Sequence, residues 1–286
     1  FHYIFHNHDR ARCYVESIEK TNKKSKILLM SATCHQPLSI AKYLNSLTDK
    51  KISVAETSER LVPLTFSNKG IKLKDIRDAI VFCFSRTAIS KLLYEFIQIR
   101  KKIDRKKIIE ISDLAYDNKI EFMPEWEYGV SAYHGKLLPK EKMFIEYLFR
   151  KGYIDVVVGT DALALGVNLP AKYIVIAQTY KPTNKHLEPS EFLQLAGRAG
   201  RYGYHDEGIV TWLEESPVEI RGINTKKMFD WLKDAELEPV EIEVEVDITA
   251  LLNGRHAEEE AQLMLKYMYP KREKEKGMFK KYLEQI

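Results

Sequence analysis

The sequence predicts an α/β fold in which a largely parallel β-sheet is flanked by helices. Short apolar runs alternate along the chain with amphipathic segments and polar loops, which is the order of consecutive strand–helix units. The run Val156-Val157-Val158 carries no polar residue on either face, as is typical of a strand whose sheet is covered on both sides. Together these observations predict the fold class.

The N-terminal part of the chain shows weaker signals. Apolar runs over 26–30 and 52–55 predict short strands. The segment 36–47 predicts a helix, with Pro37 in its first turn, where a proline is tolerated. The stretch 58–66 is extended and contains a proline, so we expect it to link two domains.

The central part of the chain carries the strongest pattern. Strands are expected over 79–84, 128–133, 154–158, 173–177 and 208–213. After the first strand, one apolar face is formed by Ile89, Leu92, Leu93 and Phe96, which predicts a helix. Further helices are expected from Pro139 to about Gly152 and over 188–199, whereas 101–117 is expected to be less regular.

The pattern changes after about Ser216. Residues 240–248 alternate like a half-exposed strand, and 257–267 and 274–286 are expected to be helical. We therefore expect a small mixed C-terminal extension over 216–286.

Composition limits the classes of function. With 45 Lys and Arg residues against 41 Asp and Glu, the net charge of +4 is too small to indicate nucleic-acid binding by itself. The three cysteines, Cys13, Cys34 and Cys83, lack metal-ligand spacing, which predicts free thiols in a reducing compartment and no metal site. No apolar run approaches the roughly 18 residues of a membrane span. We expect a soluble, cytoplasmic protein, and because the chain begins at Phe1 we expect a fragment of a longer one.

Candidate ligand-binding loops follow three of the expected strands. Open α/β sheets bind ligands at the carboxyl ends of their strands. The loops there carry hydroxyl, cationic and small residues that suit phosphate or sugar oxygens: Ser85-Arg86, His134-Gly135-Lys136 and Gly159-Thr160-Asp161. One edge of the sheet is therefore expected to hold all of them.

A glycine–arginine segment is the most specific local signal. It reads Gln194-Leu195-Ala196-Gly197-Arg198-Ala199-Gly200-Arg201. Each glycine in a helix costs roughly 1 kcal/mol relative to alanine, which is tolerated where a ligand or another backbone must come close. Arginines three apart are expected to share one side of a helix, and guanidinium groups donate bidentate hydrogen bonds to phosphate. The alternative is a surface helix end with two solvated arginines.

These segments resemble, in order, the motifs of superfamily-two DExH-box helicases. Residues 194–201 resemble motif VI, and the four preceding matches are motif V at 158–171, motif IVa at 133–139, motif IV at 80–86 and motif III at 31–33. Phe1-His2 resembles the end of an Asp-Glu-x-His box. The forms His-Gly-x-Leu-Leu-Pro and Gly-x-Asn-x-Pro-Ala resemble the Ski-two-like branch, which includes RNA-exosome helicases and some DNA-repair helicases. The resemblance covers about residues 1 to 215.

The resemblance also implies what this chain lacks. No Gly-x-x-x-x-Gly-Lys-Ser/Thr loop is present in its 286 residues, and the Asp and Glu that hold Mg²⁺ would precede Phe1. We therefore expect ATP and Mg²⁺ to be bound mainly by a missing first RecA-like domain, and this chain alone to be inactive. The implied domains are a remnant of that first domain at 1–57, a linker at 58–66, a second RecA-like domain at 67–215 and the extension.

Roles follow from the resemblance residue by residue. Arg198 and Arg201 would be arginine fingers, and Gln194 would lie near the γ-phosphate or attacking water. Asp161, Gly166 and Gly197 would line the nucleotide side of the cleft. The residues implied to couple nucleotide state to domain closure are His2, Ser31 and Thr33. Those implied to contact the phosphates of single-stranded nucleic acid are Ser85, Arg86, Gly135 and Thr160.

The sequence thus predicts an ATP-dependent helicase or translocase acting on RNA in preference to DNA, without a membrane. A DNA-repair-type helicase and a non-catalytic nucleic-acid-binding remnant remain open as alternatives. Ser31 and Thr33 are equally typical of helix caps, Thr160-Asp161 of an ordinary loop, and His134 of a structural histidine. The basic run at 101–107 is either a solvated face or an auxiliary RNA contact.

Overall fold

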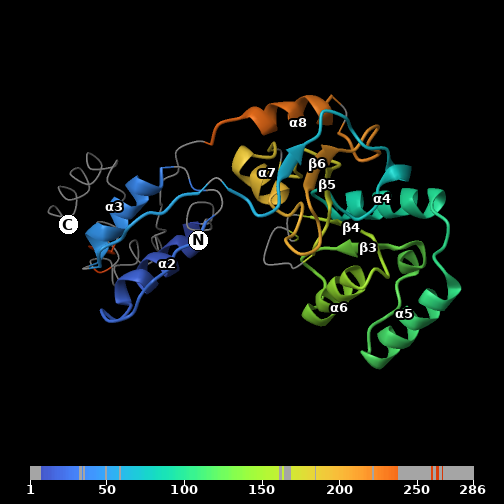
Figure 1. Ribbon diagram of the computed structural model, residues 1–286, viewed down its shortest axis with the longest axis horizontal. Coiled ribbons are helices and arrows are strands. Elements are labelled where there is room, and N and C mark those ends of the chain that lie inside the picture. The colour runs from blue at the N-terminus through green and yellow to red at the C-terminus, as the bar shows by residue number, and fades with distance from the viewer. Residues whose placement is uncertain are drawn as a thin grey trace. The chain divides into compact units, whose positions relative to one another are not determined.

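The computed structural model divides into two compact units, 1–58 with 237–286 and 59–236, which are described separately (Figure 1). The residues that the structure describes are 8–31, 34, 36–48, 50–57, 59–160, 163, 169–183, 185–220, 222–237, 259, 262, 263 and 266. The larger unit holds every described strand and all the loops of the sheet.

A six-stranded parallel sheet organises the larger unit, which confirms the predicted fold class. Its strands are β1 (Leu64–Phe66), β2 (Ala79–Phe82), β3 (Val130–Tyr133), β4 (Val156–Gly159), β5 (Tyr173–Ile176) and β6 (Gly208–Trp212). Their order in the sheet is β1-β6-β5-β2-β4-β3, and all five pairings are parallel. The central strand β2 lies between β4 and β5, with Ala79 opposite both Val156 and Tyr173.

Both faces of the sheet are buried, which explains why its strands lack polar alternation. Along β2, Ile80 and Phe82 enter one apolar core, whereas Ala79 and Val81 enter the other. Successive side chains of a strand point to opposite faces, so a strand covered on both sides must be apolar throughout. Each buried valine, isoleucine or phenylalanine of such a strand contributes roughly 1.5–3 kcal/mol by leaving water.

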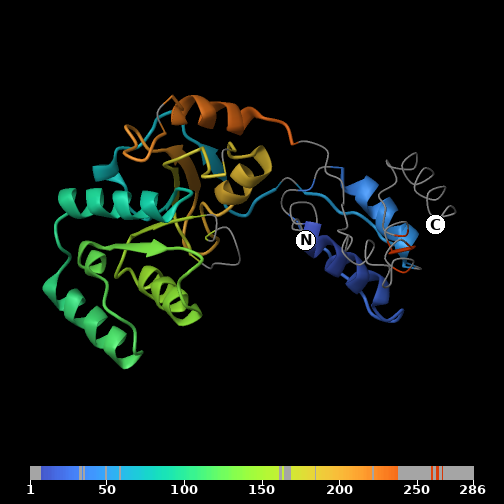
Figure 2. The ribbon, with the colours of Figure 1, turned by 180° about the vertical axis from the view of Figure 1, so that it is seen from behind.

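Helices cover the two faces unequally. Helix α4 (Arg86–Ile99) packs on one face through Ile89, Leu92 and Phe96. Four helices contribute to the core on the other face: α5 (Arg105–Asp117), α6 (Pro139–Arg150), α7 (Pro189–Ala196) and α8 (Thr225–Asp234). Figure 2 shows the same layers from behind. Short 3-10 turns lie at Leu73–Asp75 and Pro124–Tyr128.

The smaller unit differs from the expected one. Its described helices are α2 (His8–Lys20), which the sequence pattern did not predict, and α3 (Pro37–Leu47), which it did. They share a small core that includes Val15 and Leu44. The expected strands at 26–30 and 52–55 are not strands; Leu28 and Met30 are 81% and 70% exposed, so this apolar run has no sheet to pack on among the described residues.

The larger unit also extends beyond the boundaries expected at 67 and 215. Within the expected linker, β1 pairs with β6, with Leu64 opposite Gly208. The charged segment at 101–117 contains helix α5, because Ile111 and Ala115 reach the core despite the surrounding lysines. In the expected extension, α8 packs Phe229 against Trp212, with ring centroids 5.2 Å apart.

Some expected elements of the C-terminal extension fall outside the described residues. They are the strand at 240–248, the helix at 274–286 and most of the helix at 257–267. Within the described part of the chain, no helix is both long enough and apolar enough to span a membrane.

Candidate functional site

The loops after four strands meet at the carboxyl edge of the sheet and line one concavity of about 480 Å³. Its lining comprises Phe84, Ser85, Arg86, Thr87, His134, Gly135, Lys136, Thr160 and Pro182. All four residues predicted to contact nucleic acid are therefore brought together, although β2, β3 and β4 are far apart in the sequence.

Ser85 fixes the start of α4 at this concavity. Its side chain accepts a hydrogen bond from the backbone N–H of Ala88 at 3.0 Å, so Ser85 is the N-cap. The next residue, Arg86, is exposed at the first position of the helix. A helix N-terminus carries partial positive charge, and the Arg86 guanidinium adds to it, so an anion is favoured here.

The loop after β3 presents open backbone and a buried histidine nitrogen. Gly135 is exposed, and a Cβ added to it would have no atom within 4 Å. The Nδ1 atom of His134 is buried and has no hydrogen-bond partner among the described residues. Burial lowers the pKa of His134, with smaller contributions from the nearby cations Arg86 and Lys142, so the ring is neutral at neutral pH.

The loop after β4 is tied to the end of β3. Thr160 donates its backbone N–H to the Tyr133 carbonyl at 3.3 Å. A Cβ at Gly159 would lie 2.4 Å from that same carbonyl oxygen, so only glycine allows the two strand ends to approach this closely. Two residues predicted to line the nucleotide side, Asp161 and Gly166, lie outside the described residues.

The arginines predicted as fingers lie in a turn, not on a helix, which corrects the sequence expectation. Helix α7 ends at Ala196, and Gly197 is its C-cap. The chain then leaves the helix axis at Gly200, whose φ of +67° is a left-handed conformation that favours glycine. We call residues 197–205 the arginine turn; Arg198 is partly buried in it and Arg201 is exposed.

The arginine turn packs against the amino edge of the sheet. Gly200 donates its N–H to the carbonyl of Ala171, just before β5, at 2.9 Å. Gly208, the first residue of β6, donates to the carbonyl of Pro63, just before β1, at 2.8 Å. A Cβ on Gly200 would lie 2.6 Å from the Gly208 nitrogen. The turn is thus separated from the concavity by the length of a four-residue strand such as β2, about 13 Å.

Of the other residues predicted for the site, three lie among the described residues: Gln194, Gly197 and Ser31. Gln194 is partly buried on α7, two residues from the fully buried Phe192, and Gly197 is exposed. Ser31 is exposed in the other unit, whereas His2 and Thr33 lie outside the described residues. The predicted coupling role of these last three residues stays a prediction.

Sequence reasoning missed the side chains that hold the arginine turn. Arg60 donates from Nη2 to the Ala199 carbonyl at 3.2 Å and, more weakly, to that of Gly197 at 3.5 Å. His205 contacts Asp78 through Nε2 at 2.9 Å. In each of these two contacts, Arg60 to Ala199 and His205 to Asp78, the partners lie more than 120 residues apart in the sequence. No local pattern marks any of them as functional.

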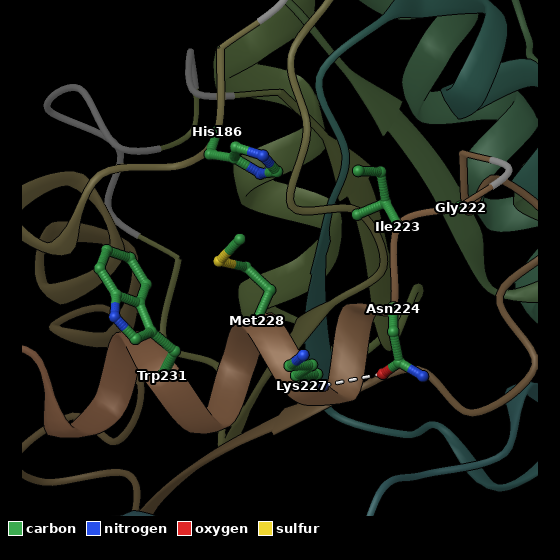
Figure 3. Close-up of a pocket in the computed structure, with 7 residues that line it drawn as sticks. All are labelled: His186, Gly222, Ile223, Asn224, Lys227, Met228 and Trp231. Carbon is green, nitrogen blue, oxygen red and sulfur yellow. Dashed lines mark hydrogen bonds between the residues drawn. The ribbon is translucent and has the colours of Figure 1, made fainter.

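A second concavity, of about 520 Å³, lies between α8 and the loop that precedes α7 (Figure 3). Met228 and Trp231 of α8 face His186 of that loop across it. His186 pairs with Tyr180 in an isolated antiparallel bridge, and their ring centroids are 4.9 Å apart. None of the residues predicted for the site lines this concavity.

The described groups suit phosphate rather than a metal ion. Arg198 and Arg201 provide guanidinium donors, which bind phosphate oxygens and cannot coordinate Mg²⁺. Among the described residues, no group of three or more His, Cys, Asp or Glu side chains is placed to hold a metal.

A comparison with protein families matches residues 59–203 to the helicase conserved C-terminal domain. The chain belongs to this helicase family. The matched segment begins at the start of the larger unit and ends inside the arginine turn, so it contains both the carboxyl-edge concavity and both arginines.

Curated relatives place this helicase domain in the Ski2-like branch of superfamily two. It is 33% identical over 171 residues to the probable helicase HelY of Mycobacterium tuberculosis, covering 53% of this chain and 19% of HelY. It is 34% identical over 165 residues to the antiviral helicase SKI2 of Saccharomyces cerevisiae, covering 56% and 12%. It is 29% identical over 213 residues to the ATP-dependent DNA helicase Hel308 of Thermoplasma volcanium, covering 66% and 30%. The chain therefore spans less than a third of the length of each of these relatives.

Proposed function

We propose that this chain is the second motor domain of an ATP-dependent helicase or translocase that moves along single-stranded nucleic acid, with RNA as the preferred substrate. The observation that carries the proposal is the concavity at the carboxyl edge, where Ser85, Arg86, Gly135 and Thr160 meet. Open backbone, an N-capped helix and an exposed arginine suit a phosphate backbone of any sequence.

Two further roles belong to the proposal. The carboxyl-edge concavity is half of the single-strand track, and Arg198 and Arg201 are the arginine-finger half of the ATPase cleft. The other half, with the phosphate-cradling loop and the Mg²⁺ ligands, comes from a first RecA-like domain, on the same polypeptide or on another. Opening and closing between the two domains then moves the strand by differential affinity for the two states.

The preference for RNA rests on the relatives. SKI2 is named an antiviral helicase and mtr4 of Schizosaccharomyces pombe an ATP-dependent RNA helicase, whereas Hel308 is named a DNA helicase. A DNA-repair-type helicase is therefore the second candidate. A non-catalytic binding remnant is disfavoured because both arginines are present in a tightly held turn.

Equilibrium binding tests the track. Fluorescently labelled single-stranded RNA and DNA of equal length and matched sequence are titrated with this chain, and Arg86→Ala is expected to weaken binding about tenfold by removing a charge-assisted hydrogen bond. Lys91→Ala is the matched control, because Lys91 is an exposed cation of the same helix that does not line the concavity. Equal losses for the two variants would show that only general charge matters and would reject the track.

ATP hydrolysis tests the motor. We expect this chain alone to show no turnover above background with or without RNA, and turnover when the first RecA-like domain is supplied. Nucleic-acid-stimulated hydrolysis by this chain alone would contradict the division of the cleft between two domains. A complete protein that binds RNA but never hydrolyses ATP would favour the binding remnant.

A further inference from the structure

The backbone of the arginine turn is held at four places, three of them at or before Gly200. The first is the contact of Gly200 with Gly208, and the second is the Gly200 hydrogen bond to Ala171. The third is the pair of hydrogen bonds from Arg60 to the carbonyls of Ala199 and Gly197, and all three hold the turn up to Gly200. They do not fix the peptide of Arg201, which follows and is exposed.

His205 closes the turn around Arg201. The carbonyl of Arg201 accepts the backbone N–H groups of Tyr204 and His205, each at 3.0 Å. The backbone N–H of Arg201 donates a hydrogen bond to Nδ1 of His205, with 3.3 Å between the two nitrogen atoms. The N–H and the carbonyl of Arg201 therefore both find their hydrogen-bond partners in Tyr204 and His205.

The same ring reaches the start of the central strand. Nε2 of His205 lies 2.9 Å from Oδ2 of Asp78, the residue before β2. Because Nδ1 accepts a hydrogen bond from Arg201, the proton of the neutral ring lies on Nε2, which donates to the carboxylate. The His205 side chain is only 11% exposed, whereas the Asp78 side chain is 44% exposed, so the ring is largely buried and its carboxylate partner is half-open to water.

Asp78 is itself held in an unusual conformation. Its φ of +45° is in the left-handed region, and its carbonyl accepts the N–H of Tyr173 at the start of β5 at 3.0 Å. The main chain of the residue that contacts His205 is thus hydrogen-bonded between two central strands of the sheet, β2 and β5.

We propose that His205, oriented by Asp78, is a positioning residue that fixes Arg201 relative to the central strands of the sheet. The inference rests on the proposed function of Arg201 as an arginine finger. An arginine finger acts on charge that develops in the transition state, so its position matters more to kcat than to ATP binding. A small displacement of such a group lowers the rate by up to about a hundredfold.

The test measures steady-state ATP hydrolysis by the complete motor, this chain with its first RecA-like domain, at saturating single-stranded RNA. His205→Phe keeps an aromatic ring and removes both hydrogen bonds. Asp78→Gly removes the carboxylate while tolerating positive φ, and Asp78→Asn keeps an oxygen acceptor and also tolerates positive φ. Tyr202→Ala is the control, because Tyr202 is an exposed neighbour in the same turn.

We expect His205→Phe and Asp78→Gly to lower kcat about tenfold to a hundredfold, with the KM for ATP changed by less than about twofold. Asp78→Asn and Tyr202→Ala are expected to stay within about twofold of the unmodified protein in both constants. A purely structural role would instead lower the melting temperature, and at a temperature well below melting it would leave kcat unchanged.

Arg201→Ala in the same assay separates this inference from the proposed function. If Arg201→Ala lowers kcat and His205→Phe does not, the positioning role is overturned and the finger stands. If Asp78→Asn is impaired as much as Asp78→Gly, the hydrogen bond from Nε2 is not what orients the ring, and the inference is also overturned. If Arg201→Ala itself hydrolyses ATP normally, the proposed finger fails, and the positioning role that depends on it fails too.

Discussion

The two edges of the sheet are built in opposite ways. At the carboxyl edge, the loops leave backbone exposed, and Gly135 has open space where a side chain would be. At the amino edge, Gly200 and Gly208 leave no room for even one extra carbon. Arg60 adds hydrogen bonds to the turn there, although burial lowers the pKa of its guanidinium.

This difference fits two kinds of ligand contact. A track for single-stranded nucleic acid has to release and rebind successive phosphates, so it needs accessible groups that bind weakly. A transition-state contact needs one fixed geometry, so the protein has to hold it by packing and hydrogen bonds. The open edge and the packed edge therefore match the two roles proposed for them, and each role can be disturbed separately.

The largest expected effect is at the amino edge. Arg198→Ala and Arg201→Ala in the complete motor should each lower kcat for ATP by at least about a thousandfold, as loss of an arginine finger does in GTPases. The affinity for single-stranded RNA in the absence of ATP should not change, since the arginine turn lies at the opposite edge from the concavity.

Arg86→Ala at the carboxyl edge should show the opposite pair of effects, with weaker RNA binding and a nearly normal kcat at saturating RNA. A variant at either edge that impairs both measurements equally would show that the two edges are not separate sites.

The second effect compares two glycines by stability. Gly200→Ala should lower the free energy of unfolding by at least about 2 kcal/mol, because an L-residue is strained at φ +67° and its Cβ would meet the Gly208 backbone at 2.6 Å. Gly135→Ala should change it by less than about 0.5 kcal/mol, since nothing lies within 4 Å of the added carbon. Urea denaturation of this chain, followed by tryptophan fluorescence, measures both. Similar losses for the two variants would contradict the packed and open descriptions.

The amino-acid pattern was sufficient to predict five of the six described strands and the open edge, whereas β1 lies in the segment expected to be a linker. Strand positions and the loops after each strand are local features, so Ser85, Arg86, Gly135 and Thr160 could be assigned to one edge from their places in the sequence. The contacts at the packed amino edge could not be predicted in this way. Its contacts, such as Arg60 to Ala199 and His205 to Asp78, join residues brought together only by the strand order, which a single sequence does not reveal.

The errors have the same origin. The apolar run at 26–30 has the pattern of a strand, but among the described residues of its unit no strand pairs with it. The glycine–arginine segment continues the apolar spacing of α7, yet the left-handed Gly200 turns the chain to meet Ala171 and Gly208. In both cases the outcome depended on tertiary partners, absent among the described residues for the run at 26–30 and present for Gly200.

A smaller effect concerns the salt dependence of binding at the open edge. Lys136 is an exposed cation of the concavity, and Lys136→Ala should reduce the slope of log K against log salt concentration by about one unit. The slope is measured by titrating labelled single-stranded RNA at several salt concentrations. Lys91→Ala should leave the slope unchanged, because Lys91 is exposed on α4 but does not line the concavity. An unchanged slope for Lys136→Ala would remove this residue from the track.

The smallest effect is the pH dependence of stability that His134 contributes. Burial lowers its folded-state pKa below the usual value of 6.5, so the unfolded chain binds this proton more readily than the folded one. The resulting penalty is absent well above pH 6.5 and grows as the pH falls through 6.5 towards the lowered pKa. His134→Asn should therefore lose less stability between about pH 7.5 and about pH 5.5 than the unmodified chain, as measured by urea denaturation at each pH. The control is His186→Asn, which changes an exposed histidine. If both variants follow the unmodified chain, the buried Nδ1 of His134 does not limit protonation, and the open edge tolerates a charged histidine as readily as solvent does.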